Sequence, residues 1–433
     1  MTTAPPRAEP RTPQLRAVKG MNDILPDEIA RWQHLEQLFA ETARCYGFRE
    51  VRTPYVEPTG LFVRTIGEAT DVVEKEMYSF THHDESLTLR PEATAGAARA
   101  YVEHRIHTRE PVTKWYCTGP MFRAERPQRG RYRQFSQIDC EVFGDPGPGC
   151  DAELIDMLVG LFARLKIPDV RVLVNSIGGA EARARYRDGL VAFLEPRRAE
   201  LSTDSQRRLA TNPLRILDSK DERDKLIVAE APGLETYLSE EDRTHFDGLL
   251  RALTALGVPF TVDSRLVRGL DYYTRTLFEI KGASDKLGAG DTLVGGGRYD
   301  GMIEELGGPS VPAVGFAAGI ERLLIASEPE ETAPAVDAYV APLGGTAFEA
   351  ALTLGRDLRR EGIVTEVDTR GGSLKSQLRR ANALGCRMVL ILGDSEIAAG
   401  IVQLKDLAAH AQDATPRSDV VRIVLDRLKA RSR

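Results

Sequence analysis

The highest concentration of positive charge in this sequence lies between two phenylalanines. The stretch FRAERPQRGRYRQF, residues 122–135, contains five arginines, although the whole chain has a formal net charge of −6. Arginine stays charged and can bind a phosphate group through two parallel hydrogen bonds. A local basic surface of this kind can bind phosphates on an acidic protein. A solvated hairpin loop explains a single charged run equally well.

The strand that follows these arginines carries polar groups along one face. Because side chains of an extended chain alternate between two faces, FSQIDCEVF separates into two sets. The first face comprises Phe135, Gln137, Asp139 and Glu141, and the second comprises Ser136, Ile138, Cys140 and Val142. An aromatic ring, an amide and two carboxylates therefore lie beside arginines. Such a surface could stack a base, bind phosphates and hold a polar ligand.

A second stretch gathers charged and aromatic residues around a glycine. It reads RLVRGLDYYTRTLFE and contains Arg268, Asp271, Tyr272 and Tyr273. These residue types can bind an anion and line a polar pocket. A bend in a strand with cross-strand aromatic pairs is the structural alternative.

Two glycine-containing stretches complete the candidates. GGGRYDG, residues 295–301, lets the backbone approach another group closely, although a plain turn also fits it. GFAAGIERLL, residues 315–324, places Arg322 at the start of an apolar helix. A salt bridge from Arg322 to Glu321 or Asp337 is the structural alternative, and exposed pairs of that kind contribute little.

Several common catalytic and cofactor motifs are missing. The sequence has no Gly-Lys dipeptide, which excludes a P-loop, and no CxxC pair among its five cysteines. GPGCDA, residues 147–152, fits a loose dinucleotide pattern but reads better as a turn into a helix. No Ser-His-Asp array or metal-ligand cluster stands out, and we predict no metal site on the protein. His82 and His83 are best explained as an exposed turn.

The elements that must position these residues can be read from periodicity. Apolar spacing predicts a helix over 27–48 and an amphipathic helix over 151–165, with Asp151 as a plausible N-cap. The arginine stretch predicts an antiparallel hairpin of two long strands, 112–125 and 131–144, joined by RPQRG. The remaining predicted strands and strand-containing stretches cover residues 48–58, 86–106, 260–280, 292–308 and 313–326.

Length and composition predict more than one domain. A chain of 433 residues is too long for a single hydrophobic core. After SEPEETAPAV at 327–336 the pattern changes to short apolar strands that alternate with helices. We predict a catalytic domain over 16–328 with a helical insertion at about 180–255, and a small α/β domain over 334–433. Prolines predict a mobile tail over residues 1–15. No apolar run suits a membrane helix or secretory signal, so we expect a cytoplasmic protein.

Together these stretches resemble histidyl-tRNA synthetase, a class II aminoacyl-tRNA synthetase of bacterial type. LVRGLDYYTRTLFE and GGGRYDG resemble its two histidine-specific signatures, and GPMFRAERPQRGRYRQFSQIDCEVFG resembles class II motif 2. YGFREVRTPYVEP resembles motif 1, AVGFAAGIERLL resembles motif 3, and NPLRILDSK resembles the helical insertion of bacterial members. The resemblance implies an α+β catalytic domain with a six-stranded antiparallel sheet, a C-terminal α/β anticodon-binding domain and a homodimer.

The resemblance implies a histidine–tRNA ligase. Such an enzyme joins L-histidine and ATP into histidyl-adenylate with release of pyrophosphate, then transfers histidine to the 3′ end of tRNA(His) with release of AMP. ATP would enter with Mg²⁺, and no prosthetic group is implied. A histidine-binding regulatory paralogue of an ATP phosphoribosyltransferase is the alternative. Such paralogues lack the anticodon-binding domain and usually lose the ATP-binding arginines, which this chain retains.

The resemblance also assigns roles to individual residues. The catalytic residues would be Arg268 and Arg123, and ATP would be bound by Arg123, Arg131, Phe135 and Arg322. Histidine would be bound by Glu92, Thr94, Arg123, Gln137, Glu141, Arg268, Tyr272 and Tyr273. The hairpin loop, with Arg126, Gln128 and Arg129, would reach the tRNA acceptor end.

Two residues depart from the usual family pattern. The family commonly has His at the position of Ser136 and often Gly at that of Asp139. We expect little consequence for Ser136, which alternation places on the other face. Asp139 would either add negative charge to the pocket or pair with a neighbouring arginine.

Overall fold

The computed structural model describes residues 15–68, 70–217, 219, 221–267, 270–282, 287, 291–328 and 336–431. The chain divides into two compact units, residues 1–330 and 331–433, and each is described by itself. The tail predicted for residues 1–15 lies, except for Leu15, outside the described residues. Among the described helices, none has both the length and the apolar character needed to cross a membrane.

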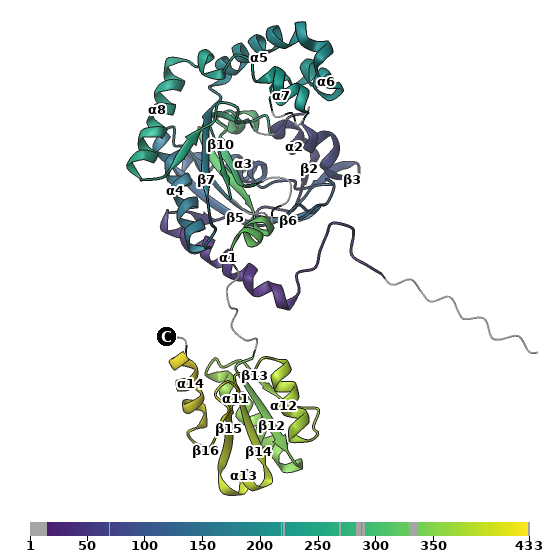
Figure 1. The fold of residues 1–433 in the computed structure, drawn as a ribbon, viewed down its shortest axis with the longest axis vertical. Coiled ribbons are helices and arrows are strands. Elements are labelled where there is room, and N and C mark those ends of the chain that lie inside the picture. The colour runs from purple at the N-terminus through teal and green to yellow at the C-terminus, as the bar shows by residue number, and fades with distance from the viewer. Residues whose placement is uncertain are drawn as a thin grey trace, which may run out of the picture. The chain divides into compact units, whose positions relative to one another are not determined.

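An eight-stranded sheet forms the centre of the first unit (Figure 1). The strand order is β1-β5-β6-β11-β10-β9-β7-β8. The six strands from β5 to β7 in this order are antiparallel, as the resemblance implied, but a short parallel strand extends each edge. The strands are β1 (Arg49–Glu50), β5 (Thr113–Phe122), β6 (Gln134–Phe143), β7 (Arg171–Ser176), β8 (Phe260–Val262), β9 (Thr274–Lys281), β10 (Thr292–Arg298) and β11 (Ala313–Gly319).

One face of this sheet is covered by long helices that build the main core. The apolar face of β6, with Ile138, Cys140 and Val142, is completely buried against them. The alternation read from the sequence is therefore confirmed for this strand. The covering helices are α1 (Pro26–Cys45), α4 (Pro148–Arg164), α8 (Glu240–Ala255) and α10 (Ile320–Ala326).

The polar face of β6 is turned toward a second group of elements. Helix α3 packs there, α2 and α9 contact α3, and a three-stranded antiparallel sheet of order β2-β4-β3 contacts α2. His83 and Asp84 form an exposed tight turn between β3 and β4 and have positive φ. The turn predicted at His82 and His83 is therefore confirmed for His83, whereas the exposed His82 is the last residue of β3. These elements are α2 (Thr59–Ile66), α3 (Thr94–Glu103), α9 (Met302–Glu305), β2 (Val56–Pro58), β3 (Tyr78–His82), β4 (Glu85–Leu89) and a π-helical turn (Val72–Glu76).

Three predictions about local structure were wrong. The strand predicted over 48–58 is divided between β1 and β2, which belong to different sheets, and Pro54 between them has no amide hydrogen to donate. The strand predicted over 260–280 is interrupted between β8 and β9. Asp151 is not an N-cap, because α4 already begins at Pro148 with Gly147 as its N-cap.

Three helices and their connecting 3₁₀ turns project beyond the sheet as a small helical layer. Its own core contains Leu190, Leu194, Leu201, Leu209 and Ile216. Helix α8, which the prediction placed in this layer, instead packs on α4. We therefore restrict the name helical insertion to residues 180–239. It comprises α5 (Ala180–Leu194), α6 (Thr203–Thr211), α7 (Glu222–Val228) and the turns Glu195–Glu200, Pro213–Ile216 and Leu234–Tyr237.

The second unit has the alternating strands and helices predicted from its sequence (Figure 1). Its five-stranded sheet has the order β13-β12-β14-β15-β16. The first three strands are parallel to one another, and β15 is antiparallel to both of its neighbours, β14 and β16. The strands are β12 (Ala338–Leu343), β13 (Thr365–Val367), β14 (Met388–Gly393), β15 (Ile401–Asp406) and β16 (Ala411–Pro416). The helices are α11 (Gly345–Arg360), α12 (Leu374–Ala383), α13 (Asp394–Ala399) and α14 (Val420–Arg431).

Candidate active site

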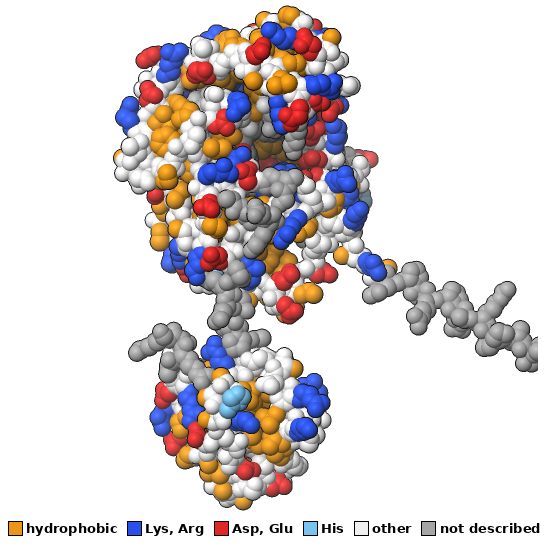
Figure 2. All heavy atoms as spheres, in the orientation of Figure 1, with side chains coloured by type: hydrophobic (Ala, Val, Ile, Leu, Met, Phe, Trp, Pro, Cys, Tyr) orange, Lys and Arg blue, Asp and Glu red, His pale blue; other side chains and the backbone are white. Residues whose placement is uncertain are grey.

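A cavity of about 270 Å³ lies over the polar face of β6. Strands β6, β10 and β11, the start of α3, the π-helical turn and the helical insertion all contribute to its wall. On the face drawn in Figure 2, the first unit is hollowed next to the insertion, with acidic and basic side chains at the rim. Six residues that the sequence assigned to histidine binding line this cavity: Glu92, Thr94, Arg123, Gln137, Tyr272 and Tyr273.

Glu92 is fixed at the start of α3. Its two carboxylate oxygens accept hydrogen bonds from the backbone N–H groups of Thr94 and Ala95, each at 2.9 Å. These are amides of the first turn, which have no partner within the helix. Burial raises the pKa of Glu92, and the bonds to Ala95 and Thr94 oppose that shift. The carboxyl is therefore held rigidly at the cavity wall.

Glu141 lies behind the cavity and is completely enclosed. Its Oε1 accepts a hydrogen bond from the Thr94 hydroxyl at 2.6 Å, and its Oε2 accepts one from the Tyr299 hydroxyl. Burial raises the pKa of Glu141 well above its usual range. Position 315 has to be glycine, because a Cβ there would lie 1.8 Å from Oε2 of Glu141.

Gln137 and Asp139 differ, although they share a face of β6. Gln137 lines the cavity, and its Oε1 has no hydrogen-bond partner among the described residues. Asp139 is completely buried and does not line the cavity. Its Oδ2 accepts only a long contact from the Cys117 thiol at 3.8 Å, and no ion pair joins it to an arginine in the described part of the chain. Burial, and then the charge of Glu92, raise the pKa of Asp139 well above normal.

Three tyrosine rings form the aromatic side of the cavity. The centroids of Tyr272 and Tyr273 are 4.7 Å apart, and those of Tyr272 and Tyr299 are 5.6 Å apart. Sequence reasoning missed Tyr299, which also lines the cavity. The GGGRYDG stretch contains Tyr299, and its glycines indicate a close approach of the backbone without showing which side chain points inward.

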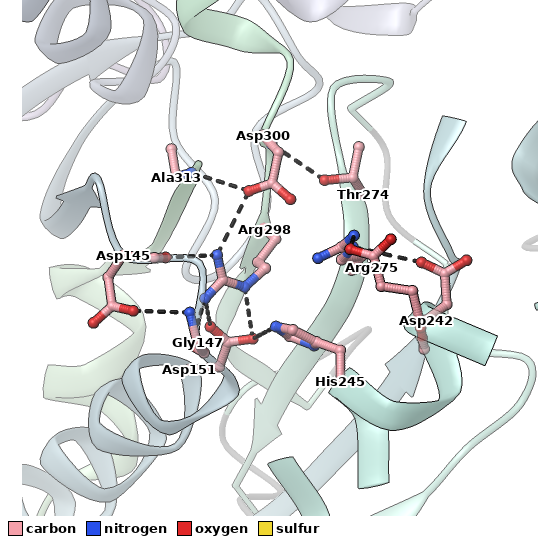
Figure 3. Close-up of polar contacts among 12 residues, drawn as sticks. Asp145, Gly147, Asp151, Asp242, His245, Thr274, Arg275, Arg298, Asp300 and Ala313 are labelled. Atoms are coloured by element: carbon pink, nitrogen blue, oxygen red, sulfur yellow. Dashed lines mark hydrogen bonds and ion pairs between the residues drawn. The ribbon is translucent and has the colours of Figure 1, made fainter. Parts of the chain in front are cut away.

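The arginine beside Tyr299 has a structural role (Figure 3). Arg298 is completely buried and pairs with Asp151, with Nε donating to Oδ2 at 3.0 Å. Its Nη1 and Nη2 donate to the carbonyl oxygens of Asp145 and Gly147 at 2.9 and 2.6 Å. These bonds join the end of β10 to the first turn of α4. They fix the backbone from which Tyr299 reaches the cavity.

The residues assigned to ATP lie only partly in this cavity. Arg123 lines it, donates from Nε to the Pro91 carbonyl at 2.9 Å, and lies 5.4 Å from the centre of the Phe135 ring. Phe135 and the remaining two arginines, Arg131 and Arg322, do not line it. Arg268, the other predicted catalytic residue, lies outside the described residues.

The two outlying arginines are close enough to influence one another. Arg322 donates from Nε to the Thr292 carbonyl at 2.8 Å, and Arg131 lies 3.6 Å from Glu125. Burial and then the charge of Arg131 lower the pKa of Arg322. An anion placed near both would be attracted to each.

The hairpin loop between β5 and β6 borders two other hollows. Arg126 and Gln128 line one of about 630 Å³, together with Lys75 and Glu76. Arg129 lines another of about 570 Å³, beside α1 and α10. The three residues assigned to the tRNA acceptor end therefore do not converge on one hollow.

The arrangement suits a small ligand with both donors and negative charge. Carboxylates and an amide oxygen on one wall can accept hydrogen bonds from ammonium or ring N–H groups. Arg123 on the other side can attract a carboxylate or phosphate. None of the described residues that line the cavity is a serine or cysteine that could act as a nucleophile.

Comparison with known proteins gives a consistent family. The family model described as Histidyl-tRNA synthetase matches residues 20–323, and the one described as Anticodon binding domain matches 337–427. A protein named Histidine--tRNA ligase from Sorangium cellulosum (strain So ce56) is 56% identical over 414 residues, which cover 96% of this chain and 97% of the relative.

Solved structures agree with this result. The crystal structure of apo S. aureus histidyl-tRNA synthetase matches with a TM-score of 0.81 and 33% identity, over 95% of this chain and 100% of that one. Histidyl-tRNA synthetase from Nostoc sp. PCC 7120 matches with a TM-score of 0.68 over 96% of this chain and 100% of that one; at 20% identity it supports the fold alone. This chain belongs to the histidyl-tRNA synthetase family.

Proposed function

We propose that this protein is a histidine–tRNA ligase and that the cavity over β6 is its activation site. L-Histidine and ATP give histidyl-adenylate and pyrophosphate, and histidine then passes to the 3′ end of tRNA(His) with release of AMP. The observation that carries the proposal is one cavity in which carboxylates and an unpartnered amide oxygen face an arginine. Identity of 56% to a histidine–tRNA ligase supports it.

The reaction needs no nucleophile from the enzyme, because histidine supplies it. The α-carboxylate of histidine attacks the α-phosphorus of ATP, a P–O bond forms, and the bond to pyrophosphate breaks. The enzyme has to hold the two substrates in line and stabilise charge at phosphorus. We assign this stabilisation to Arg123 and Arg268. ATP enters as its Mg²⁺ complex, which is part of the substrate.

For histidine, we assign Glu92, Thr94 and Gln137 to the α-amino group. The free Oε1 of Gln137 supports this role, because an ammonium group supplies the missing donor. We assign Glu141 and Tyr273 to the two imidazole nitrogens. Glu141 already accepts two hydrogen bonds, but a carboxylate has lone pairs for further donors.

The other side chains complete the histidine pocket. Tyr272 lines it, and we add Tyr299, whose hydroxyl orients Glu141. A pocket whose buried polar groups need partners from imidazole should reject side chains of similar size that lack them.

For ATP, we assign Arg123, Arg131, Phe135 and Arg322. Arg123 would hold the α-phosphate, while Arg131 and Arg322 would hold the outer phosphates. Phe135 and Arg322 would enclose the adenine ring. The hairpin loop brings Arg131 toward Arg322, since a Cβ on the neighbouring Gly130 would lie 3.3 Å from Cγ of Arg322.

For tRNA, we assign the hairpin loop with Arg126, Gln128 and Arg129 to the acceptor end. We assign the second unit to the anticodon, because its sequence matches an anticodon-binding domain. Lys375 and Arg379 are exposed one turn apart on α12 and can offer charge to phosphates. We further propose that the protein works as a homodimer in the cytoplasm.

The alternative function, a histidine-binding regulatory subunit, is not favoured. One similar structure is a Bacillus halodurans protein described as an ATP phosphoribosyltransferase regulatory subunit/histidyl-tRNA synthetase. It is 19% identical to this chain, which supports the fold alone. The match to an anticodon-binding domain and the 56% identical ligase favour aminoacylation.

Amino-acid-dependent exchange of pyrophosphate into ATP tests the proposal. Each of the twenty amino acids is supplied separately to the full-length protein with ATP and Mg²⁺. Exchange only with histidine, followed by charging of tRNA(His), is the expected result. Exchange with a different amino acid, or histidine binding without any exchange, would overturn it.

A further inference from the structure

The segment Asp271–Tyr273 has two sides. On one side Tyr272 and Tyr273 line the cavity. On the other side the segment contacts the helical insertion, which is distant in sequence. The described residues between β8 and β9 make few backbone hydrogen bonds of their own, such as Leu266 N–H to Asp263 O and Asp271 N–H to Ile66 O. Side chains from outside therefore matter for its position.

Asn212 of the insertion binds the first residue of this segment. It ends α6, and its Nδ2 donates to both carboxylate oxygens of Asp271, at 2.9 and 3.1 Å. Asp271 is also confined on its far side, since a Cβ on Gly67 would lie 2.9 Å from its Oδ2. The carboxylate is thus seated between the end of α2 and the insertion.

Arg183 of the insertion binds the last residue of the same segment. It lies on α5, and its Nη1 donates to the backbone carbonyl of Tyr273 at 2.7 Å. Its Nε is buried and has no hydrogen-bond partner among the described residues. Burial lowers the pKa of Arg183, while the charges of Asp271 and then Glu305 oppose that shift. The guanidinium therefore also favours the placement of Asp271.

Apolar packing joins the same two parts. Tyr186 and Leu234 of the insertion are buried in one cluster with Tyr273 and Leu277. Leu214, two residues after Asn212, packs at the edge of this cluster. The insertion therefore forms the support behind the tyrosine side of the cavity.

We propose that Asn212 and Arg183 are positioning residues for histidine, which hold the tyrosine side of the pocket through Asp271 and the Tyr273 carbonyl. Neither side chain lines the cavity, so each acts through the segment that does. Small displacements of a binding group can cost large factors in rate or affinity. The inference rests on the proposed function, because it takes histidine as the occupant.

The test measures KM for histidine and KM for ATP in pyrophosphate exchange by the full-length protein. Asn212→Ala and Arg183→Met should each raise KM for histidine by about tenfold and leave KM for ATP within about twofold. Matched controls lie in the same insertion. Gln206→Ala removes an amide that donates to the Leu201 carbonyl, and Arg185→Met removes a guanidinium on α5 that donates to the Tyr237 carbonyl.

A reciprocal pair separates positioning from general damage to folding. Asn212→Asp alone places two carboxylates face to face, whereas combination with Asp271→Asn restores a pair of one amide and one carboxylate. The double variant should reverse most of the rise in the KM for histidine that Asn212→Asp causes.

Three outcomes would overturn the inference: an unchanged histidine KM in both single variants, equal rises for histidine and ATP, or equal shifts in the controls. Wild-type exchange with histidine is measured in the same series. Its absence would instead remove the proposed function.

Discussion

Two sites in the first unit bury carboxyl groups in opposite ways. In the helical insertion, Asp224 is completely buried but fully supplied with donors. It accepts bonds from Ser202 N–H at 2.8 Å and from the hydroxyls of Ser202, Ser205 and Ser219 at 2.6 Å each. Burial alone would raise its pKa, yet these hydrogen bonds lower the pKa of Asp224 to about 2.

Around the cavity, Glu92, Asp139 and Glu141 are also buried, but the pKa of each is raised by burial. One oxygen of Asp139 has no partner in the described part of the chain. We call these three groups the cavity carboxyls. Glu92 and Glu141 accept two hydrogen bonds each, against four at Asp224, and burial outweighs them. Buried groups with raised pKa values beside a cavity are candidates for contact with a ligand. Asp224 therefore stabilises the fold, whereas we propose that Glu92 and Glu141 bind the substrate.

The largest effect should come from the cation that faces the cavity carboxyls. Arg123→Gln should lower the rate of histidine-dependent pyrophosphate exchange by roughly 10²–10³-fold, as for loss of one donor to a charged transition state. Single-turnover formation of adenylate measures this directly. Arg133→Gln is the control, because Arg133 lies in the same hairpin, bonds to the Glu125 carbonyl and does not line the cavity. Equal losses in both variants would contradict the role of Arg123.

Asp224 should show the next largest effect, and on stability only. Asp224→Asn removes the charge that three hydroxyls and one amide stabilise, and should lower the free energy of unfolding by about 3 kcal/mol. Thermal and denaturant unfolding measure the loss, with Asp247→Asn on the exposed face of α8 as control. The KM for histidine of the folded fraction should not change. A variant as stable as wild type would remove the contrast between the two sites.

Glu141→Gln should show the reverse pattern. Histidine should bind about 2 kcal/mol more weakly, or roughly 30-fold, because a charged acceptor for imidazole is lost. The affinity for ATP should be nearly intact, and stability should not fall, because an amide, unlike a carboxyl, has no charged form that burial disfavours. Calorimetric titration with each substrate separates these results. Equal losses for histidine and ATP would make Glu141 a structural residue.

The sequence predicted the parts of this comparison that depend on local rules. Period-two alternation placed Gln137 and Glu141 on one face of β6 and Ile138 on the other, because a strand interior obeys that rule strictly. The GGGRYDG stretch showed that the backbone comes close to something, but not which side chain points inward. Tyr299 reaches the cavity and Arg298 turns away toward Asp151, a choice fixed by packing against α4.

Contacts between distant segments could not be predicted in this way. The serines around Asp224 lie as many as 22 residues away from it, and Asn212 meets Asp271 across a separation of 59 residues. No local pattern links them, since each pair depends on how the insertion folds back on the sheet. For the same reason Asp151 looked like a helix cap, whereas its true partner, Arg298, lies 147 residues further along the chain.

The smallest effect is a difference in how stability depends on pH. The folded-state pKa of Glu141 is raised, so between the unfolded value near 4.5 and that raised value the folded protein keeps a proton that the unfolded chain has lost. Stability from this source is present at low pH and declines as pH rises through the window, by less than about 1.4 kcal/mol per pH unit. The cavity carboxyls interact, so they titrate as a set.

Glu141→Gln removes this proton, and its melting temperature relative to wild type should therefore rise from pH 5 to pH 8. Asp224 acts in the opposite sense, because its pKa is lowered: its contribution is complete above about pH 4 and is lost as the pH falls toward 2. The melting temperature of Asp224→Asn should consequently approach that of wild type only in acid. Parallel pH profiles for the two variants would show that both carboxyls have the same kind of environment, and the distinction between the two sites would fail.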